Sequence, residues 1–290
     1  MMAKRRYYYF VSGLADLLFD SGSNLPDMAE FREELKSNLH PDDYYLSSLL
    51  FLPYDNRNLI SFLEGNDNHL EESGNYSRDD FEEQLRILES VLKEKDILPA
   101  YMVKIMSENL NSGVDLDVMK IRKSLYEGYV KMALNSGNSF LKEWVRFDTD
   151  LKNIFSFLNS KSLDIDPEPQ MIGDNAFTQE LLELFRSGKD FSMSFESEYA
   201  SSIFKIAMEN EFIEREKRID LFRWNYIDTI TFFEYFTIDM ILGYLIKYSI
   251  VRRWVEMDPE TGRNMLQRFI KDTESRIISG TVRSDDSMIK

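Results

Sequence analysis

Few side chains in this sequence could perform chemistry. The 290-residue chain has two histidines, His40 and His69, and no cysteine. His40 stands before Pro41 at an expected helix start and His69 lies in a polar loop, so both favour surface positions over roles as a ligand or a base. Because cysteine is absent, disulfides, thiol catalysis and zinc–thiolate sites are impossible. We therefore expect no catalytic residue, no cofactor and no bound metal, and the sequence predicts a protein that is not an enzyme.

Carboxylates offer the remaining route to a metal site. Asp164, Asp166 and Glu168 alternate along one stretch and could bind calcium, but this stretch lacks the glycine and the full set of oxygen ligands of a calcium-binding loop. A solvated linker is the better interpretation. The sequence also contains no glycine-rich phosphate loop with a following Lys-Ser/Thr and no G-x-S-x-G turn. An enzyme with a carboxylate-based metal site remains a minor alternative.

One internal repeat stands out. Residues 55–63 and 150–158 both read D-x-[RK]-N-[LI]-x-S-F-L, with Asp55 and Asn58 in the first copy and Asp150 and Asn153 in the second. Helix starts commonly combine Asp or Asn with following apolar residues, but this match extends beyond what helix capping requires. We favour a duplication in which each Asp caps a helix and each Asn bonds a neighbouring segment. Residues 214–219 form a weaker third echo.

The composition limits the class of partner. Acidic residues outnumber basic ones by 51 to 35, which gives a formal net charge of −16. Nucleic acid requires a basic surface and is not expected as a partner, whereas a basic protein is compatible with this charge. No segment is apolar over the roughly 20 residues that a membrane-spanning helix needs, so direct membrane insertion is not expected. The N-terminus superficially resembles a signal peptide, but its three tyrosines and the lack of a convincing cleavage site favour a mature segment.

The run from Phe236 to Glu256 is the expected centre of the fold. Apolar residues cover most of its helical surface, and such a helix belongs in a core. Asp239, Gly243 and Lys247 form a narrow polar ridge, in which the small Gly243 would allow one close approach between helices. We expect three aromatic side chains in the core, namely Trp144, Tyr244 and Trp254.

Helical periodicity and capping signals along the rest of the chain predict an all-α, multi-helical fold. Ser77 and Asp80 form a near capping box, residues 195–233 are typical of one long helix, and residues 7–11 could form one short N-terminal strand. The expected organisation is a single helical body over residues 1–290. It would be built from repeated helical units at approximately 1–75, 76–175 and 176–272, with a polar tail at 273–290.

Four stretches of the chain resemble a known family. They are YYYFVSGLADL at 7–17, PYDNRNLISFL at 53–63, WVRFDTDLKNIFSFL at 144–158 and RWNYIDTITFFEYFTIDMILGYLIKYSIVRRW at 223–254. The first and last are similar to a family of bacterial proteins encoded among V-type ATPase subunits. The D-x-x-N-[LI] stretches more remotely resemble the C subunit of bacterial and archaeal V/A-type ATPases, the counterpart of the eukaryotic d subunit. In the C subunit three similar helical units form a funnel, which would account for the repeat.

The resemblance implies a function in mechanical coupling. The C subunit lies between the central rotor shaft and the membrane ring of proteolipid subunits, and it transmits torque without chemistry of its own. We therefore expect a non-catalytic central-stalk subunit whose partners are other V/A-type ATPase subunits, located in the cytoplasm and peripheral to the inner membrane. The alternative is an all-α scaffold or regulatory protein that binds a partner through a helix groove.

Overall fold

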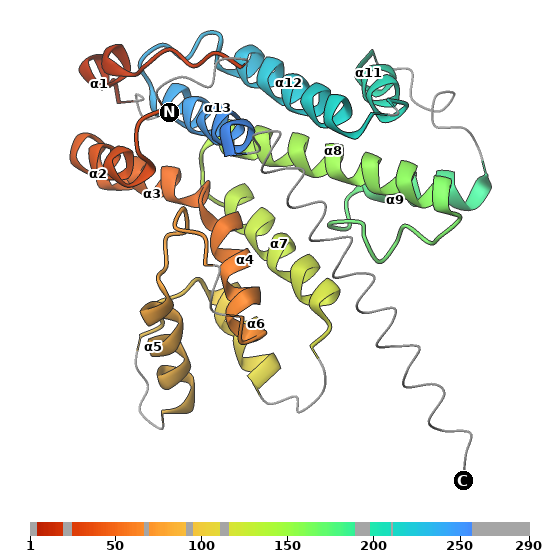
Figure 1. Ribbon diagram of the computed structural model, residues 1–290, viewed down its shortest axis with the longest axis horizontal. Helices are drawn as coiled ribbons and strands as arrows, with labels where there is room; N and C mark the ends of the chain where they lie inside the picture. Colours follow the sequence, from red (N-terminus) through yellow and green to blue (C-terminus); the bar gives the residue numbers. More distant parts are fainter. Residues whose placement is uncertain are drawn as a thin grey trace. The chain divides into compact units, whose positions relative to one another are not determined.

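Helices form all the regular structure in the part of the chain that the structure describes. The computed structural model describes residues 5–19, 25–66, 70–90, 95–110, 116–188, 198–209 and 211–256, and no strand occurs in these ranges. The all-α prediction is confirmed. The helices, drawn in Figure 1, are α1 (Tyr8–Gly13), α2 (Met28–Asn38), α3 (Pro41–Leu49), α4 (Leu52–Leu63), α5 (Arg78–Glu89), α6 (Ala100–Leu110), α7 (Val118–Leu134), α8 (Ser139–Leu163), α9 (Ala176–Ser187), α11 (Glu198–Ala207), α12 (Phe212–Thr231) and α13 (Ile238–Glu256).

The short N-terminal strand expected at residues 7–11 is wrong. These residues enter α1, in which the N–H of Val11 donates to the carbonyl of Tyr7 at 2.9 Å. The N–H of Tyr7 donates to the carbonyl of Phe236 at 2.7 Å, which is a single bond to a turn rather than a ladder. A strand needs a partner along its length, and the described residues provide none, so the aromatic run adopts a helical turn instead.

The chain divides into two compact units, where the sequence predicted a single helical body. One unit comprises Met1–Leu14 and Pro26–Ile246, and the other comprises Ala15–Leu25 and Lys247–Lys290. The division into three repeated units at 1–75, 76–175 and 176–272 stays a prediction. The expected polar tail at 273–290 lies outside the described residues.

The longest helix of the larger unit, α8, makes the most varied contacts. It is 25 residues long and packs against α7, α9, α11 and α12, while α7 also packs against α4 and α6 (Figure 1). Trp144 is buried in this helix, which confirms its predicted place in the core. Apolar residues at helical spacing make the buried face of α8, which includes Phe140, Leu141, Val145, Leu151, Ile154 and Phe157.

Helix α13 is a core helix, as its sequence indicates. In the larger unit it buries Ile238, Ile241, Leu242, Leu245 and Ile246. A Cβ atom added at Gly243 would lie 2.9 Å from Cγ2 of Thr231 and 3.0 Å from Cγ2 of Ile227, so the predicted close approach exists and involves α12. Asp239 is also buried, and its Oδ1 accepts a 2.6 Å hydrogen bond from Asn138, the residue that caps the N-terminus of α8.

Two of the three predicted core aromatics are only half-buried. Tyr244 lies against Phe31 with 5.7 Å between ring centroids, and its residue as a whole stays partly exposed. Trp254 lies in the last turn of α13, where Arg252 and Arg253 take up much of the helix surface. Its ring lies 6.4 Å from that of Phe19 in the same unit. The prediction that Trp254 lies in the core is therefore wrong, because the residue stays partly exposed at the end of α13.

Helix boundaries follow the capping residues. Ser77 and Asp80 form the expected capping box at the start of α5, and Asp117 caps α7. The single long helix expected over residues 195–233 is wrong, because Glu198–Ala207 and Phe212–Thr231 form two separate helices, α11 and α12. Glu209, between them, pairs with Arg218 of α12 at 3.1 Å. None of the helices in the described ranges combines the length and the apolar character needed to cross a membrane.

Candidate functional site

Asn58 and Asn153 occupy matching places in the repeat and form matching hydrogen bonds. The Nδ2 of Asn58 donates to the carbonyl of Glu71 at 2.9 Å, and its Oδ1 accepts from the N–H of Glu71 at 2.7 Å. Asn153 forms the same pair of bonds with Ile172, at 2.9 and 2.8 Å. Each side-chain amide thus binds both backbone groups of one residue in the loop that follows its helix. These two asparagine clamps agree with the hypothesis that each Asn bonds a neighbouring segment.

Asp55 is buried and does not cap its own helix, so that part of the hypothesis is wrong. Asp55 lies inside the first turn of α4, and its Oδ1 accepts from the N–H groups of Asn75 and Tyr76 at 2.6 and 3.0 Å. Its Oδ2 accepts from Nδ2 of Asn75 at 2.7 Å. Burial raises the pKa of Asp55 to about 6, although these hydrogen bonds oppose the shift. The carboxylate therefore fixes the segment that leads into α5.

This segment packs closely on α4. A Cβ atom at Gly74 would lie 2.6 Å from Oδ1 of Asp55 and 2.8 Å from Nδ2 of Asn58, so only glycine fits there without movement. Arg32 of α2 donates to the carbonyls of Ser73 and Gly74 at 3.0 and 2.6 Å. The first asparagine clamp is therefore part of a larger polar network that joins α2, α4 and the approach to α5.

Asp150 does not reproduce the contacts of Asp55. It lies in the middle of α8, where it cannot cap the helix, and it is only partly buried. Burial raises the pKa of Asp150 to about 6, and the charge of Arg146 lowers it only in part. The two copies of the repeat thus share the function of their asparagines, whereas the aspartates have diverged.

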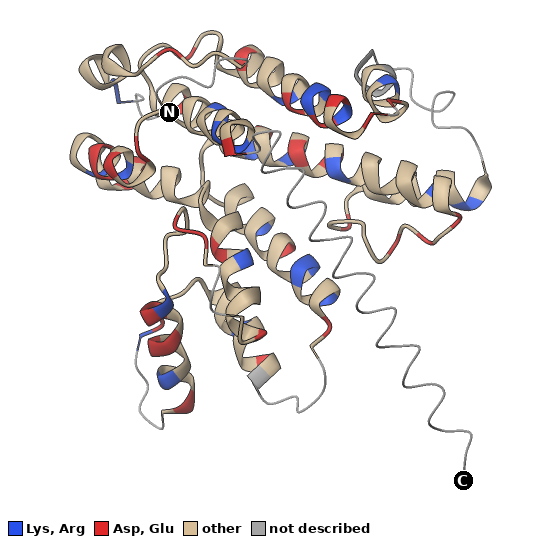
Figure 2. Ribbon diagram, viewed as in Figure 1, with Lys and Arg blue, Asp and Glu red and all other residues tan. Residues whose placement is uncertain are grey.

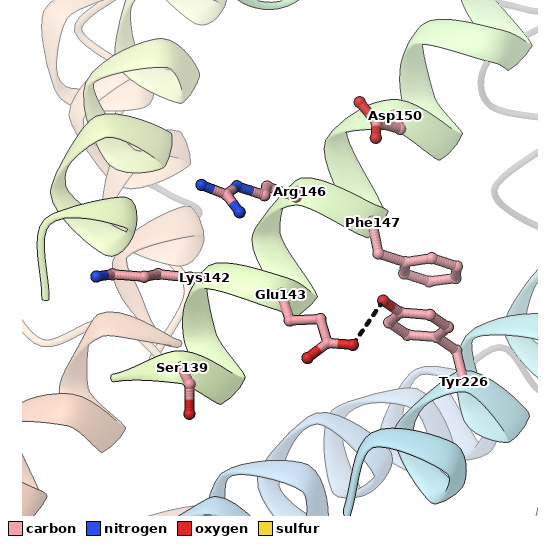
Figure 3. A pocket seen from close by; sticks show the side chains of 7 residues that line it. All are labelled: Ser139, Lys142, Glu143, Arg146, Phe147, Asp150 and Tyr226. Carbon is pink, nitrogen blue, oxygen red and sulfur yellow. Dashed lines mark hydrogen bonds between the residues drawn. The ribbon is translucent and has the colours of Figure 1, made fainter. Parts of the chain in front are cut away.

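Asp150 is one of the residues that line a groove beside α8, shown in Figure 3. The groove has a volume of about 500 Å³ and is lined by Ser139, Lys142, Glu143, Arg146, Phe147, Asp150 and Tyr226. The rings of Phe147 and Tyr226 stack at 3.7 Å between centroids, with an angle of 4° between their planes. The hydroxyl of Tyr226 donates to Glu143 at 3.4 Å, and burial together with this carboxylate raises the tyrosine pKa to about 12. Stacked aromatics thus hold α12 against α8 at one edge of the groove.

An ionic cluster lies where α7, α8 and α12 meet. The carboxylate of Asp148 accepts from Nε and Nη2 of Arg223, at 3.0 and 2.9 Å, and from the hydroxyl of Tyr126 at 3.1 Å. Lys152 also pairs with Asp148, and Arg223 reaches Asp220 at 3.2 Å. Burial alone would raise the pKa of Asp148, but Lys152 and Arg223 hold it well below its usual range. The ionised carboxylate links the three helices.

The sequence did not identify this ionic cluster. Asp148 and Lys152 lie four residues apart in a predicted helix, and such spacing favours a salt bridge on one helix. Nothing in the chain order indicates that Arg223, 75 residues further on, completes the cluster. The pairing depends on how α12 packs on α8.

The histidines and carboxylates singled out in the sequence do not come together as a metal-binding group in the described part of the chain. No group of three or more His, Asp or Glu side chains in it could hold a metal ion. His40 is the N-cap of α3, where its ring accepts from the N–H of Asp42, and His69 lies outside the described residues. Asp164 ends α8 in a left-handed conformation, and Asp166 accepts from the N–H of Glu168 at 3.0 Å. The acidic stretch therefore forms a turn. The third, weaker candidate copy of the repeat, residues 214–219, lies in the first turns of α12. Its residues Arg218 and Glu214 form a surface ion pair, and it has no asparagine that could form a clamp.

In its described residues the protein is a helical fold with an apolar core, to which buried polar contacts add links between helices and loops. Residues 2–277 match the model of the family described as "Protein of unknown function (DUF2764)". Because this match spans nearly the whole chain, the protein belongs to that family. No curated protein and no solved structure matches the chain.

Proposed function

We propose that this protein is a non-catalytic subunit of the central stalk of a V/A-type ATPase, which couples the rotor shaft to the proteolipid ring. The proposal starts from the resemblance of residues 53–63 and 144–158 to the C subunit of such ATPases. In the cell the chain would be cytoplasmic and peripheral to the inner membrane, and it would contact the membrane through protein partners.

The observation that carries the proposal is the pair of asparagine clamps. Asn58 and Asn153 bind the loop after α4 and the loop after α8 in the same way, through both backbone groups of one residue. Two helices that lie about a hundred residues apart thus bind the loops that follow them through the same pair of asparagine hydrogen bonds. A chain assembled from similar helical units, as in the C subunit, is expected to have this property.

The ionic cluster supports the same function in a second way. A subunit that transmits torque must keep its helices in register under load. Asp148 binds groups from α7, α8 and α12 at a single point, and several charge-assisted hydrogen bonds of this kind resist sliding between helices.

Affinity purification from the native membrane tests the proposal. The tagged chain is purified from the source organism in a mild detergent, and co-purifying proteins are identified by mass spectrometry. We expect the stalk, catalytic and proteolipid subunits of the ATPase, and the same set when a stalk subunit carries the tag. If both tagged preparations lack the other protein even after chemical cross-linking, the proposal is wrong.

An all-α scaffold is the second candidate function. The groove beside α8 favours it, because Glu143, Arg146 and Asp150 present charges of both signs next to a stacked aromatic pair. Purification of one unrelated protein in fixed stoichiometry, in place of ATPase subunits, would support this alternative.

A further inference from the structure

Residues 5–7, here called the N-terminal strap, are bound to the start of α3 by charge. Nη2 of Arg5 donates to Oδ2 of Asp42 at 3.2 Å, and Nη1 of the same guanidinium donates to Asp43 at 3.4 Å. The helix that follows the strap, α1, contains no charged residue (Figure 2), so the strap carries all the charged side chains of residues 5–13. The ionic contact between this segment and α3 therefore depends on Arg5.

The imidazole of His40 lies within this ionic contact. Its Nδ1 accepts from the N–H of Asp42 at 3.3 Å and so caps α3, and its Nε2 lies 3.4 Å from Nη2 of Arg5. The same Nδ1 lies 3.3 Å from Oδ2 of Asp42, the oxygen that also binds Arg5. A ring nitrogen that accepts a hydrogen bond carries no proton, so the cap requires the neutral ring.

Protonation of His40 changes each of these contacts. Nδ1 gains a hydrogen, so it can no longer accept from the N–H of Asp42, and it competes with Arg5 for Oδ2 of that aspartate. The new positive charge lies 3.4 Å from the guanidinium and at the N-terminus of α3, where the helix dipole disfavours cations. The competition and the repulsion weaken the contact of Arg5 with α3, and loss of the cap loosens the start of that helix.

Tyr7 and Asp43 are the other titratable side chains beside this contact, and they form the second anchor of the strap. The hydroxyl of Tyr7 donates to Asp43 and accepts from the N–H of His40 at 3.3 Å. Burial and the neighbouring carboxylate raise the pKa of Tyr7 to about 12, so this anchor stays neutral while a histidine titrates. The N–H of Tyr7 also donates to the carbonyl of Phe236 at 2.7 Å, so the strap links α3 to the turn before α13.

We propose that the N-terminal strap is a pH-sensitive device, in which protonation of His40 loosens the link between α3 and the turn before α13. Histidine ordinarily changes its charge between about pH 5 and pH 8, so mild acidification is the signal. The side chain of His40 is 45% exposed, so the ring exchanges protons with solvent while the chain stays folded. The inference is independent of the proposed function, and either can hold without the other.

Hydrogen exchange of the full-length chain tests this device. The amides of residues 5–13 are followed by mass spectrometry at about pH 8 and about pH 5.5, and each rate is divided by that of an unstructured peptide at the same pH. We expect this ratio to be at least about threefold higher at the lower pH, because the strap opens more often once an exposed ion pair and a cap are lost. His40→Asn should abolish the difference, since asparagine caps helices and does not titrate. His69→Gln, which removes the other histidine of the chain, is the matched control and should keep it.

A second variant tests the contact itself. Arg5→Met should exchange at pH 8 about as fast as the wild type does at pH 5.5, and circular dichroism verifies that every variant folds. Asp55 and Asp150, whose pKa values are raised to about 6, remain in all variants, so any effect of theirs would survive in His40→Asn.

Four results would overturn the proposal. They are an unchanged ratio in the wild type, a rise that persists in His40→Asn, a rise that His69→Gln abolishes, and slow exchange of Arg5→Met at pH 8.

Discussion

The Asp148 carboxylate on α8 and the Arg223 guanidinium on α12 form a two-point ion pair, with both Nε and Nη2 of the arginine within 3.0 Å of Oδ1. Both side chains are mostly enclosed, and each has a second partner of opposite charge, Lys152 for Asp148 and Asp220 for Arg223. The pair connects residues that lie 75 positions apart. This ion pair stabilises the folded state only while both Asp148 and Arg223 are present.

Removal of Arg223 should therefore destabilise the protein strongly. Arg223→Met leaves Asp148 with fewer partners in a buried position, and breaking such a pair typically costs about 3–5 kcal/mol. Arg218→Met is the matched control, since Arg218 forms exposed pairs on the same helix that are worth about 1 kcal/mol or less. Urea unfolding of the two variants measures the difference. Equal free energies of unfolding would show that the ionic cluster contributes no more than a surface salt bridge.

The two asparagine clamps should contribute similar amounts to the free energy of unfolding. Asn58→Ala and Asn153→Ala each leave one backbone N–H and one C=O without their side-chain partner, which should cost about 2–4 kcal/mol for two lost bonds. Asn159→Ala is the control, because Asn159 is exposed on α8. Denaturant unfolding of the three variants provides the comparison. A large loss at one clamp with none at the other would argue against a shared function inherited by duplication.

The buried Asp55 should make stability fall as the pH rises. Its pKa is raised from 3.8 to about 6 in the folded state, so between these values the folded chain holds a proton that the unfolded chain has released. Asp55 therefore lowers the free energy of unfolding as the pH rises from 4 to 6, by about 3 kcal/mol in total. Thermal unfolding across this range, for the wild type and for Asp55→Asn, measures the effect. The variant should lose the part of the slope that Asp55 contributes and keep the part from Asp150, whose pKa is also raised to about 6. An identical slope in both proteins would assign the pH dependence to other groups.

The tryptophans should differ in their effect on stability. Trp144 is buried, and Trp144→Ala should cost about 3–5 kcal/mol, as is usual for truncation of a core aromatic. Trp254 is half-buried, so Trp254→Ala should cost clearly less, because part of its surface already contacts solvent. The two variants, unfolded side by side in urea, provide the measurement. A greater loss for Trp254→Ala would contradict the burial seen in the structure.

The sequence predicts the helical class because apolar spacing and capping residues act locally. Ser77 with Asp80 and the apolar surface of α13 are signals of this type, and the structure contains both features. The N-terminal strand failed for the opposite reason. Aromatic side chains at residues 7–11 favour a strand locally, but a strand requires a partner that sequence does not specify.

The candidate sites were less predictable, because they depend on tertiary contacts. The repeat identified Asn58 and Asn153 correctly, since each asparagine reaches a loop that is close in sequence. It misassigned Asp55, whose carboxylate turns toward the segment before α5 rather than toward the start of its own helix. Asp148 and Arg223 carry no local signal at all, because their pairing exists only after α12 has packed on α8.

The continuity of α8 restricts how this protein can change during evolution. Asp148, Asp150 and Asn153 point toward the ionic cluster, the groove and the second asparagine clamp from a single uninterrupted helix. A one-residue insertion between Asp148 and Asn153 would rotate everything beyond it by about 100° and shift it by about 1.5 Å. No adjustment of neighbouring loops could restore the ionic cluster and the second asparagine clamp at once. Length variation among relatives should therefore be confined to the loops, and the spacing of these residues along α8 should be invariant.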